Sequence, residues 1–144
     1  MKTDLFPEQV EELQTLGQQF REAQKIGDFD NAEKYLLKAW AVLPTPATDY
    51  DYSQTLSRGL VQFYRDTNQS QKAIEWLEIT KTAYGYAPNA SIEFLAGTVY
   101  FTAGEFDTAF SIFDKLYKQY KERPFKGEKP DYLAFYKSEL NNRK

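Results

Sequence analysis

The residues that could carry chemistry in this 144-residue chain are its acidic and basic side chains, because it contains no histidine and no cysteine. The usual nitrogen and sulfur ligands of zinc are therefore missing, as are histidine-activated nucleophiles. Pairs of carboxylates remain for general acid–base catalysis, and the closest are Asp28 with Asp30 and Asp49 with Asp51. Both pairs stand where we expect helices to begin, and acids there cap free backbone N–H groups. We predict no catalytic residue, no metal site and no cofactor.

The overall charge argues against two classes of partner. The chain carries 18 basic and 21 acidic residues and has a pI near 5.1, which lacks the dense positive field that nucleic acids require. No apolar run approaches the roughly 20 residues of a membrane span. Residues 1–8 turn acidic before a signal-peptide apolar region can form. We therefore expect one cytoplasmic domain over residues 1–144, with no nucleic-acid or membrane partner.

Apolar side chains recur at three- and four-residue spacing through most of the chain, which predicts an all-α protein. Pro44 and Pro46 break the chain between the second helix and the third. Asn89 is the expected cap of the fifth helix. We predict seven helices, over about residues 7–25, 29–42, 50–65, 69–84, 90–102, 105–120 and 131–140.

Two strings at distant places repeat one pattern of turn glycine, acid, aromatic residue and small alanine. They are Gly27-Asp28-Phe29-Asp30-Asn31-Ala32 and Gly104-Glu105-Phe106-Asp107-Thr108-Ala109, and Asn68-Gln69-Ser70-Gln71-Lys72-Ala73 is a degraded third copy. Ala73 follows Ala32 by 41 residues (73 − 32), and Ala109 follows Ala73 by 36 (109 − 73). Both intervals are close to the period of about 34 residues of a helical-hairpin repeat.

The residues around these alanines carry a family resemblance. Large and small apolar residues and a closing proline flank them at matching offsets, namely Leu36, Ala39, Pro44, Leu60, Tyr64, Gly97 and Tyr100. The chain therefore resembles the tetratricopeptide repeat (TPR) family over nearly its whole length, although Phe20, Asn68, Ser70 and Gly85 depart from the pattern. The resemblance implies three TPR-like hairpins, at about residues 7–44, 50–86 and 89–121. They would form a short right-handed solenoid with a capping helix at about residues 131–141.

The resemblance also implies a binding site on the concave face, which the first helix of each hairpin forms. Carried onto this sequence, it assigns partner binding to Arg21, Lys25, Arg58, Gln62, Arg65, Phe94, Thr98 and Phe101. Four of these side chains are cations, so the groove would be basic in an acidic protein. Such a groove favours an acidic segment or a C-terminal carboxylate, which arginine holds through paired hydrogen bonds.

Each group of groove residues has a structural alternative. Arg21, Arg58 and Arg65 would equally serve as solvated helix surface, paired with nearby acids. Phe94 and Phe101 would equally belong to the core, because the fifth helix is apolar nearly all round. The carboxylate clamp of some TPR co-chaperones fits poorly, since that clamp uses asparagine where this chain has Arg21 and Gln62.

Two further stretches, residues 40–52 and 124–136, resemble small bacterial TPR proteins that accompany secreted polymorphic toxins. That resemblance implies an immunity protein, which binds a cognate toxin and blocks its active surface. The alternative is a secretion chaperone or general adaptor that holds an extended peptide in the groove. In both cases we expect a non-enzymatic protein whose partner is another protein, either a toxin domain or a peptide segment.

Overall fold

The computed structural model of this protein describes residues 4–144, so residues 1–3 of the predicted domain lie outside the described residues. The prediction of seven α-helices is confirmed, and within residues 4–144 no strand is formed. Two short 3₁₀ helices lie in the connections between α2 and α3 and between α6 and α7. In chain order the elements are α1 (Pro7–Lys25), α2 (Phe29–Val42), η1 (Ala47–Asp49), α3 (Tyr52–Asp66), α4 (Ser70–Tyr84), α5 (Ala90–Thr102), α6 (Phe106–Tyr120), η2 (Arg123–Phe125) and α7 (Pro130–Asn142).

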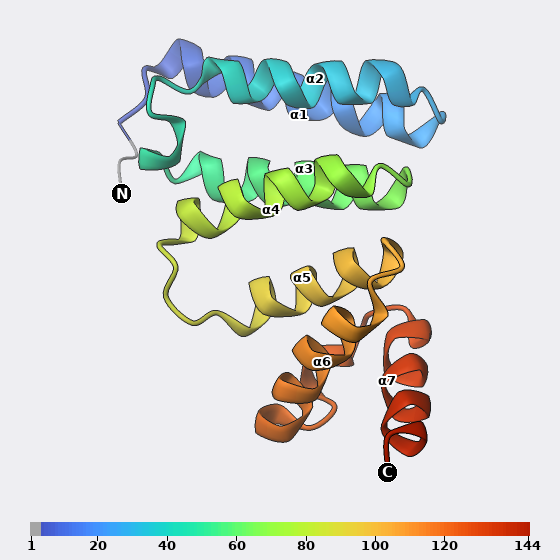
Figure 1. Cartoon of the computed structure of the whole chain (residues 1–144). Helices are drawn as coiled ribbons and strands as arrows, with labels where there is room; N and C mark the ends of the chain where they lie inside the picture. Colours follow the sequence, from blue (N-terminus) through green and yellow to red (C-terminus); the bar gives the residue numbers. More distant parts are fainter. Residues whose placement is uncertain (1–3) are drawn as a thin grey trace.

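The helices form three successive pairs. Helix α1 packs along α2, α3 along α4 and α5 along α6, and α3 and α5 also contact the pair before them. Figure 1 shows the pairs stacked one below another, with α1 and α2 at the upper end of the stack. The helix axes turn between α4 and α5, and α7 lies beside α6 at the lower end (Figure 1). Short turns make neighbouring helices antiparallel, which explains this layout.

The turn inside each pair needs a residue with left-handed backbone. Gly27 and Gly104 supply it in the first and third pairs, with φ of 77° and 80°. In the degraded second copy Asn68 takes the same place with φ of 60°. Asparagine tolerates this conformation better than most residues with a Cβ atom. The glycine-to-asparagine departure therefore leaves the turn intact.

Acids or amides stand at the N-cap of five of the seven α-helices, and two of them make side-chain capping bonds. The Asp28 carboxylate accepts a hydrogen bond from the Asn31 backbone N–H at 3.3 Å, and the Asn89 side chain accepts one from Ile92 at 3.1 Å. Asp51 also occupies an N-cap position but makes no side-chain capping bond. The predicted start of the third helix at residue 50 is wrong, because residues 47–49 form a 3₁₀ turn and Tyr50 is extended, with φ −103° and ψ 142°.

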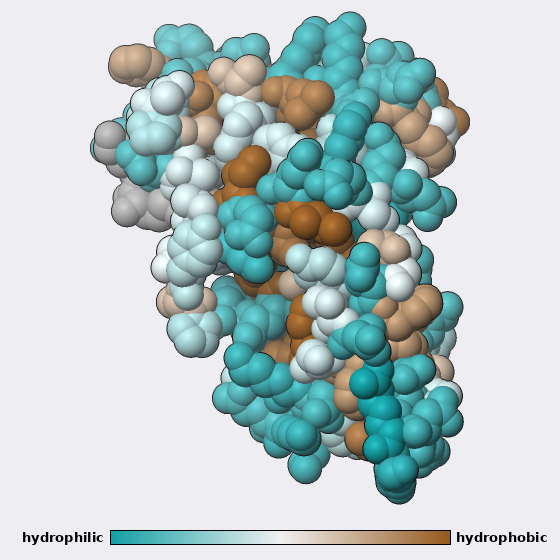
Figure 2. Space-filling view, in the orientation of Figure 1, coloured by the Kyte–Doolittle hydropathy of each residue, from teal (hydrophilic) through white to brown (hydrophobic). Residues whose placement is uncertain are grey.

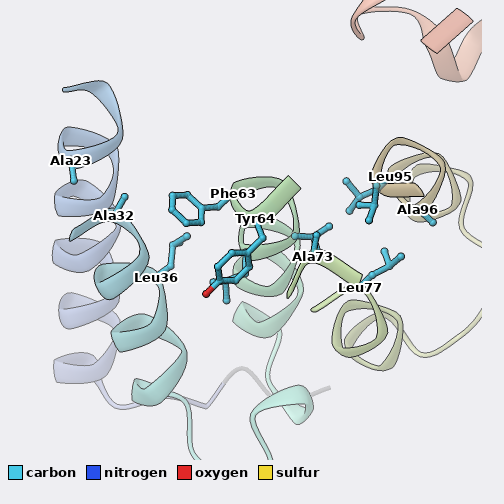
Figure 3. Packing of buried hydrophobic residues seen from close by; sticks show 12 residues of the cluster. Ala23, Ala32, Leu36, Phe63, Tyr64, Ala73, Leu77, Leu95 and Ala96 are labelled. Atoms are coloured by element: carbon cyan, nitrogen blue, oxygen red, sulfur yellow. The ribbon is translucent and has the colours of Figure 1, made fainter. Parts of the chain in front are cut away.

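The repeated alanines lie in the interior of the three helix pairs. Ala32, Ala73 and Ala109 are each 0% exposed, one in each pair. Figure 3 shows Ala32 and Ala73 among larger side chains from α2 to α5, including Leu36, Phe63 and Leu95. A methyl group at these positions permits close approach of the backbones, and any larger side chain would displace a neighbour.

Helix α7 covers an aromatic cluster at the lower end of the stack. Tyr136 follows Tyr100 by 36 residues, the same interval that separates Tyr100 from Tyr64. The Tyr136 hydroxyl donates to Asp114 at 2.7 Å, as the Tyr64 hydroxyl donates to Glu33 at 2.6 Å. Each tyrosine thus bonds to an acid of the preceding pair. Helix α7 therefore occupies the place of a further first helix.

Candidate functional site

The largest group of predicted binding residues lines one hollow between α3 and α5. This basic hollow has a volume of about 420 Å³. Its walls come from α3, from α5 and from the segment that joins α6 to α7. The lining residues are Arg58, Gln62, Arg65, Ala90, Ser91, Phe94, Leu95, Thr98, Tyr120, Arg123, Pro124 and Glu128. Three arginines and one glutamate make its lining basic, while the whole chain carries a net charge of −3.

Two matching hydrogen bonds tie α3 to α5 along the hollow. Arg58 Nη2 donates to Ser91 Oγ at 2.8 Å, and Arg65 Nη1 donates to Thr98 Oγ1 at 2.8 Å. The arginines are seven residues apart, and so are their acceptors. Seven residues make about two helical turns, so both arginines lie on one face of α3. These bonds orient the guanidinium groups along one side of the hollow.

Within residues 4–144, Arg65 forms an ion pair, whereas Arg58 does not. Arg65 Nε lies 2.8 Å from Asp66 Oδ1, and the Arg65 side chain is only 13% exposed. Arg58 and Arg123 form no ion pair with any described residue. The structural alternative of a paired arginine therefore holds for Arg65. The unpaired positive charge of the hollow comes from Arg58 and Arg123.

Phe94 positions the wall that carries Arg123. Its ring lies 5.1 Å from the Phe125 ring and 5.3 Å from the Phe113 ring, centroid to centroid. Phe125 is 6% exposed, so it anchors η2 against the last pair. Arg123 and Pro124 stand next to this anchor and reach the hollow. Phe94 is 5% exposed, so it is a core residue that also forms part of the hollow's floor.

The buried hydroxyl of Thr98, below Arg65 in the hollow, has both a hydrogen-bond donor and an acceptor as partners. Thr98 is 0% exposed, and its hydroxyl donates to the Leu95 carbonyl at 2.7 Å while it accepts from Arg65. Burial raises the pKa of the nearby Tyr132 phenol above its usual value, although the charge of Arg65 opposes this rise. Tyr132 thus stays protonated at neutral pH, and no additional negative charge competes for Arg65.

The structure brings together five of the eight predicted binding residues: Arg58, Gln62, Arg65, Phe94 and Thr98. Arg21 and Lys25 are exposed on α1 and do not line the basic hollow. Phe101 also lies outside it, because its ring packs against Phe106, Tyr132 and Phe135 at centroid distances of 5.7, 5.5 and 5.1 Å.

Sequence reasoning missed the residues that the α6–α7 connection adds to the hollow. These are Arg123, Pro124 and Glu128, next to Tyr120 at the end of α6. The string Arg123-Pro124-Phe125 contained one usable signal, because a large apolar residue within a polar connection implies that the connection folds back onto the core. That signal predicts the fold-back but not the wall to which it contributes.

Comparison with protein-family models, curated proteins and solved structures found no match for this chain. Among residues 4–144 no group of three or more acidic residues is arranged to hold a metal ion. None of the helices in that range combines the length and the hydrophobicity needed to cross a membrane.

Proposed function

We propose that this chain is a non-enzymatic protein-binding module whose basic hollow holds an acidic segment of a partner protein. The observation that carries the proposal is the placement of Arg58 and Arg123, two guanidinium groups that line one hollow without an ion pair among the described residues. A guanidinium binds carboxylates through two parallel N–H···O bonds, which favours an anionic peptide group. An aspartate or glutamate side chain and a C-terminal carboxylate have this same chemistry.

The composition of the hollow supports binding over catalysis. Its cations are arginines, which stay protonated at all physiological pH values and cannot act as general bases. Its single carboxylate, Glu128, belongs to an exposed residue. General acid–base catalysis uses a group whose pKa lies near the working pH. The lining is suited to holding an anion in place.

We further propose that the three helix pairs are TPR-type repeats forming a short right-handed solenoid, with the hollow on its concave face. The fully buried alanines of the three copies support this proposal, as do the left-handed residues that precede them. We also propose that the protein is cytoplasmic. Toxin neutralisation, implied by the resemblance to bacterial TPR proteins, stays a prediction about which partner carries the acidic segment.

A peptide titration tests the proposed function. The probe is a fluorescein-labelled octapeptide of alternating aspartate and leucine, compared with its asparagine counterpart, and binding is measured by fluorescence anisotropy. We expect Arg58→Gln with Arg123→Gln to weaken binding of the aspartate peptide by about tenfold or more, since charge-assisted hydrogen bonds contribute roughly 1.5–3 kcal/mol. Rising salt should also weaken binding, because exposed charge is screened over about 8–10 Å.

The matched control is Lys34→Gln with Lys38→Gln, which removes the same charge from exposed positions of α2 outside the hollow. This control should bind the aspartate peptide within about twofold of the wild type. Arg65→Gln alone should weaken binding less than Arg58→Gln alone, because Asp66 already neutralises Arg65. Equal affinity of the wild type and the Arg58/Arg123 double variant would exclude the basic hollow as the binding site.

A further inference from the structure

The stack has a second hollow, which lies at the junction of α4, α5 and α6. It has a volume of about 450 Å³ and shares no lining residue with the basic hollow. Its lining comes from the last turn of α4, the following loop, the first half of α5 and the middle of α6, and comprises Lys81, Tyr84, Tyr86, Ala87, Pro88, Asn89, Ile92, Glu93, Ala96, Ser111, Ile112 and Lys115. Figure 2 shows hydrophobic atoms at the surface over the junction of α4 and α5.

The preceding junction, between α2 and α4, is filled by the protein itself. There the rings of Trp40 and Trp76 meet edge to face, with centroids 5.0 Å apart and an interplanar angle of 88°. Shifting each tryptophan by its own repeat interval moves Trp40 by 41 residues to Lys81 and Trp76 by 36 residues to Ile112. Both of these residues line the second hollow. The second hollow is therefore the place where the two indole rings of the first junction have no counterpart.

Two lysines stand on the rim of the second hollow, and each lies within 3.3 Å of a carboxylate. Lys81 and Lys115 stand on it with one carboxylate, Glu93, which lies 3.3 Å from Lys115 Nζ. The partner of Lys81 is Glu78, at 3.2 Å. Exposed lysine pairs of this kind contribute roughly 0–1 kcal/mol. A carboxylate of a bound partner can therefore take the place of Glu78 or Glu93 at little cost in free energy.

We infer that the second hollow is a protein-interaction site that takes an aromatic side chain of a folded partner, with an acidic residue of that partner beside Lys81 or Lys115. The apolar floor is formed by Ile92, Ala96 and Ile112, which matches the faces of an aromatic ring. Tyr86, 66% exposed, extends the contact area beside the hollow. Aromatic anchors in apolar pockets dominate binding energy in many protein interfaces. The site is independent of the proposed function, because the basic hollow uses other residues.

A small-molecule titration tests the inference directly. N-acetyl-L-tryptophan, which carries an indole ring and a carboxylate, is titrated into ¹⁵N-labelled protein, with N-acetyl-L-tryptophanamide and N-acetyl-L-leucine as comparison probes. We expect backbone amide shifts at Tyr86, Ile92 and Ile112, with the two indole probes binding more tightly than the leucine probe. The carboxylate should strengthen binding about two- to fivefold over the amide, the range for an exposed charge pair. No shift at these residues with either indole probe would overturn the inference.

Two kinds of variant assign the binding to the second hollow. Ile112→Trp restores an indole ring at the place that corresponds to Trp76, so it should weaken indole binding at least tenfold. Ser111→Trp also fills the second hollow with an indole ring, and it changes an exposed lining residue and no core residue. Lys81→Gln with Lys115→Gln should abolish the preference for the carboxylate probe. Unchanged indole affinity in both tryptophan variants would overturn the inference.

Peptide selection then tests the kind of partner. A random peptide library displayed on phage is selected on the wild type and counter-selected on Ser111→Trp, and we expect tryptophan, tyrosine or phenylalanine next to aspartate or glutamate. Enrichment without aromatic residues would contradict the proposed occupant. Sedimentation equilibrium examines the competing occupant, a second copy of this chain. A wild-type dimer that Ser111→Trp dissociates would replace the partner protein with a self-contact. Arg58→Gln with Arg123→Gln should leave the shifts at Tyr86, Ile92 and Ile112 unchanged with both indole probes.

Discussion

Arg65 Nη1 and Thr98 Oγ1 lie 2.8 Å apart and join α3 to α5 across the floor of the basic hollow. The bond repeats the Arg58–Ser91 bond two turns earlier, at the same distance of 2.8 Å. The two acceptors differ in burial, since Thr98 is 0% exposed and Ser91 is exposed. The two bonds therefore have different roles. The buried Arg65–Thr98 bond holds α3 against α5, and the exposed Arg58–Ser91 bond orients a guanidinium group that has no ion-pair partner among the described residues.

This difference predicts unequal losses when the acceptors are removed. Thr98→Val keeps the side-chain shape but leaves an Arg65 N–H without its partner, and should lower the free energy of unfolding by about 1–3 kcal/mol. Ser91→Ala removes an exposed acceptor that water can replace, so its loss should stay within about 0.5 kcal/mol. Urea unfolding of both variants measures the difference. Equal losses would show that the buried bond does not stabilise the contact between α3 and α5.

Two helical glycines, Gly97 in α5 and Gly59 in α3, should respond in opposite ways to replacement by alanine. A Cβ atom added at Gly97 would overlap the ring of Phe113, whereas one added at Gly59 meets no heavy atom within 4 Å. Phe113 is 0% exposed and cannot move aside freely. Gly97→Ala should therefore cost about 1–3 kcal/mol through overpacking. Gly59→Ala should stabilise by about 0.5–1 kcal/mol, the intrinsic preference of a helix for alanine.

Thermal unfolding followed by circular dichroism distinguishes the two glycine variants. The melting temperature should fall for Gly97→Ala and rise for Gly59→Ala. A melting temperature of Gly97→Ala at or above that of the wild type would contradict the close approach of α5 to α6. The far-ultraviolet spectrum should stay mainly helical in both variants.

Phe94 connects the stability of the last pair with the basic hollow. Phe94→Ala removes a 5% exposed ring that contacts Phe113, Phe125 and Tyr132, so it should cost about 3–5 kcal/mol of unfolding free energy. Phe29→Ala is the control, because that ring is 50% exposed and should cost much less. A loss below about 1 kcal/mol for Phe94→Ala would place the ring outside the core.

Phe94→Ala also tests whether the α6–α7 connection is held in place by packing. If Phe125 loses its support, Arg123 should leave the hollow, and the aspartate peptide should bind more weakly than to the wild type under conditions where the variant is still folded. Limited proteolysis with trypsin should then cut after Lys126, a residue of the connection that adjoins Phe125. Unchanged peptide affinity together with unchanged proteolysis would show that the α6–α7 connection keeps its position without the Phe94 ring.

Tyr64 predicts a loss of stability at alkaline pH. Burial raises the pKa of its phenol above the usual 10.0, and the hydrogen bond to Glu33 and the charge of that carboxylate raise it further. Because the folded pKa exceeds the unfolded one, the stabilisation is fully present below about pH 10 and is lost as the pH rises towards the folded value. Tyr64→Phe removes the titrating group. Its unfolding free energy should fall less between about pH 9 and about pH 11 than that of the wild type, as measured by urea unfolding. Identical slopes would contradict the raised pKa.

Much of the helical layout could be predicted because the signals are local. The predicted bounds of α1 and α2 match the structure, and Asp28 and Asn89 cap the helices that they were expected to begin. Helix α3 was placed two residues too early, because the 3₁₀ turn at residues 47–49 has no distinct sequence pattern. Capping and left-handed turns depend on neighbours within about four residues, which a linear pattern contains.

The basic hollow could be predicted only in part. Arg58, Gln62, Arg65 and Thr98 were assigned from the groove positions that the family resemblance implies, and they line the hollow. Arg123 could not be assigned, because its place depends on Phe125 packing under Phe94 from a different part of the chain. Spacing also could not show that Asp66 neutralises Arg65 while Arg58 keeps its charge unpaired.

By itself, the sequence determined the helices, their turns and the three alanines at which the pairs close, since these depend on backbone hydrogen bonding and on side-chain size at short range. Tertiary structure decided which charges meet and which junction stays open. Trp40 and Trp76 fill one junction, whereas Lys81 and Ile112 leave the next one hollow, and this difference arises only when side chains from separate helices share one space.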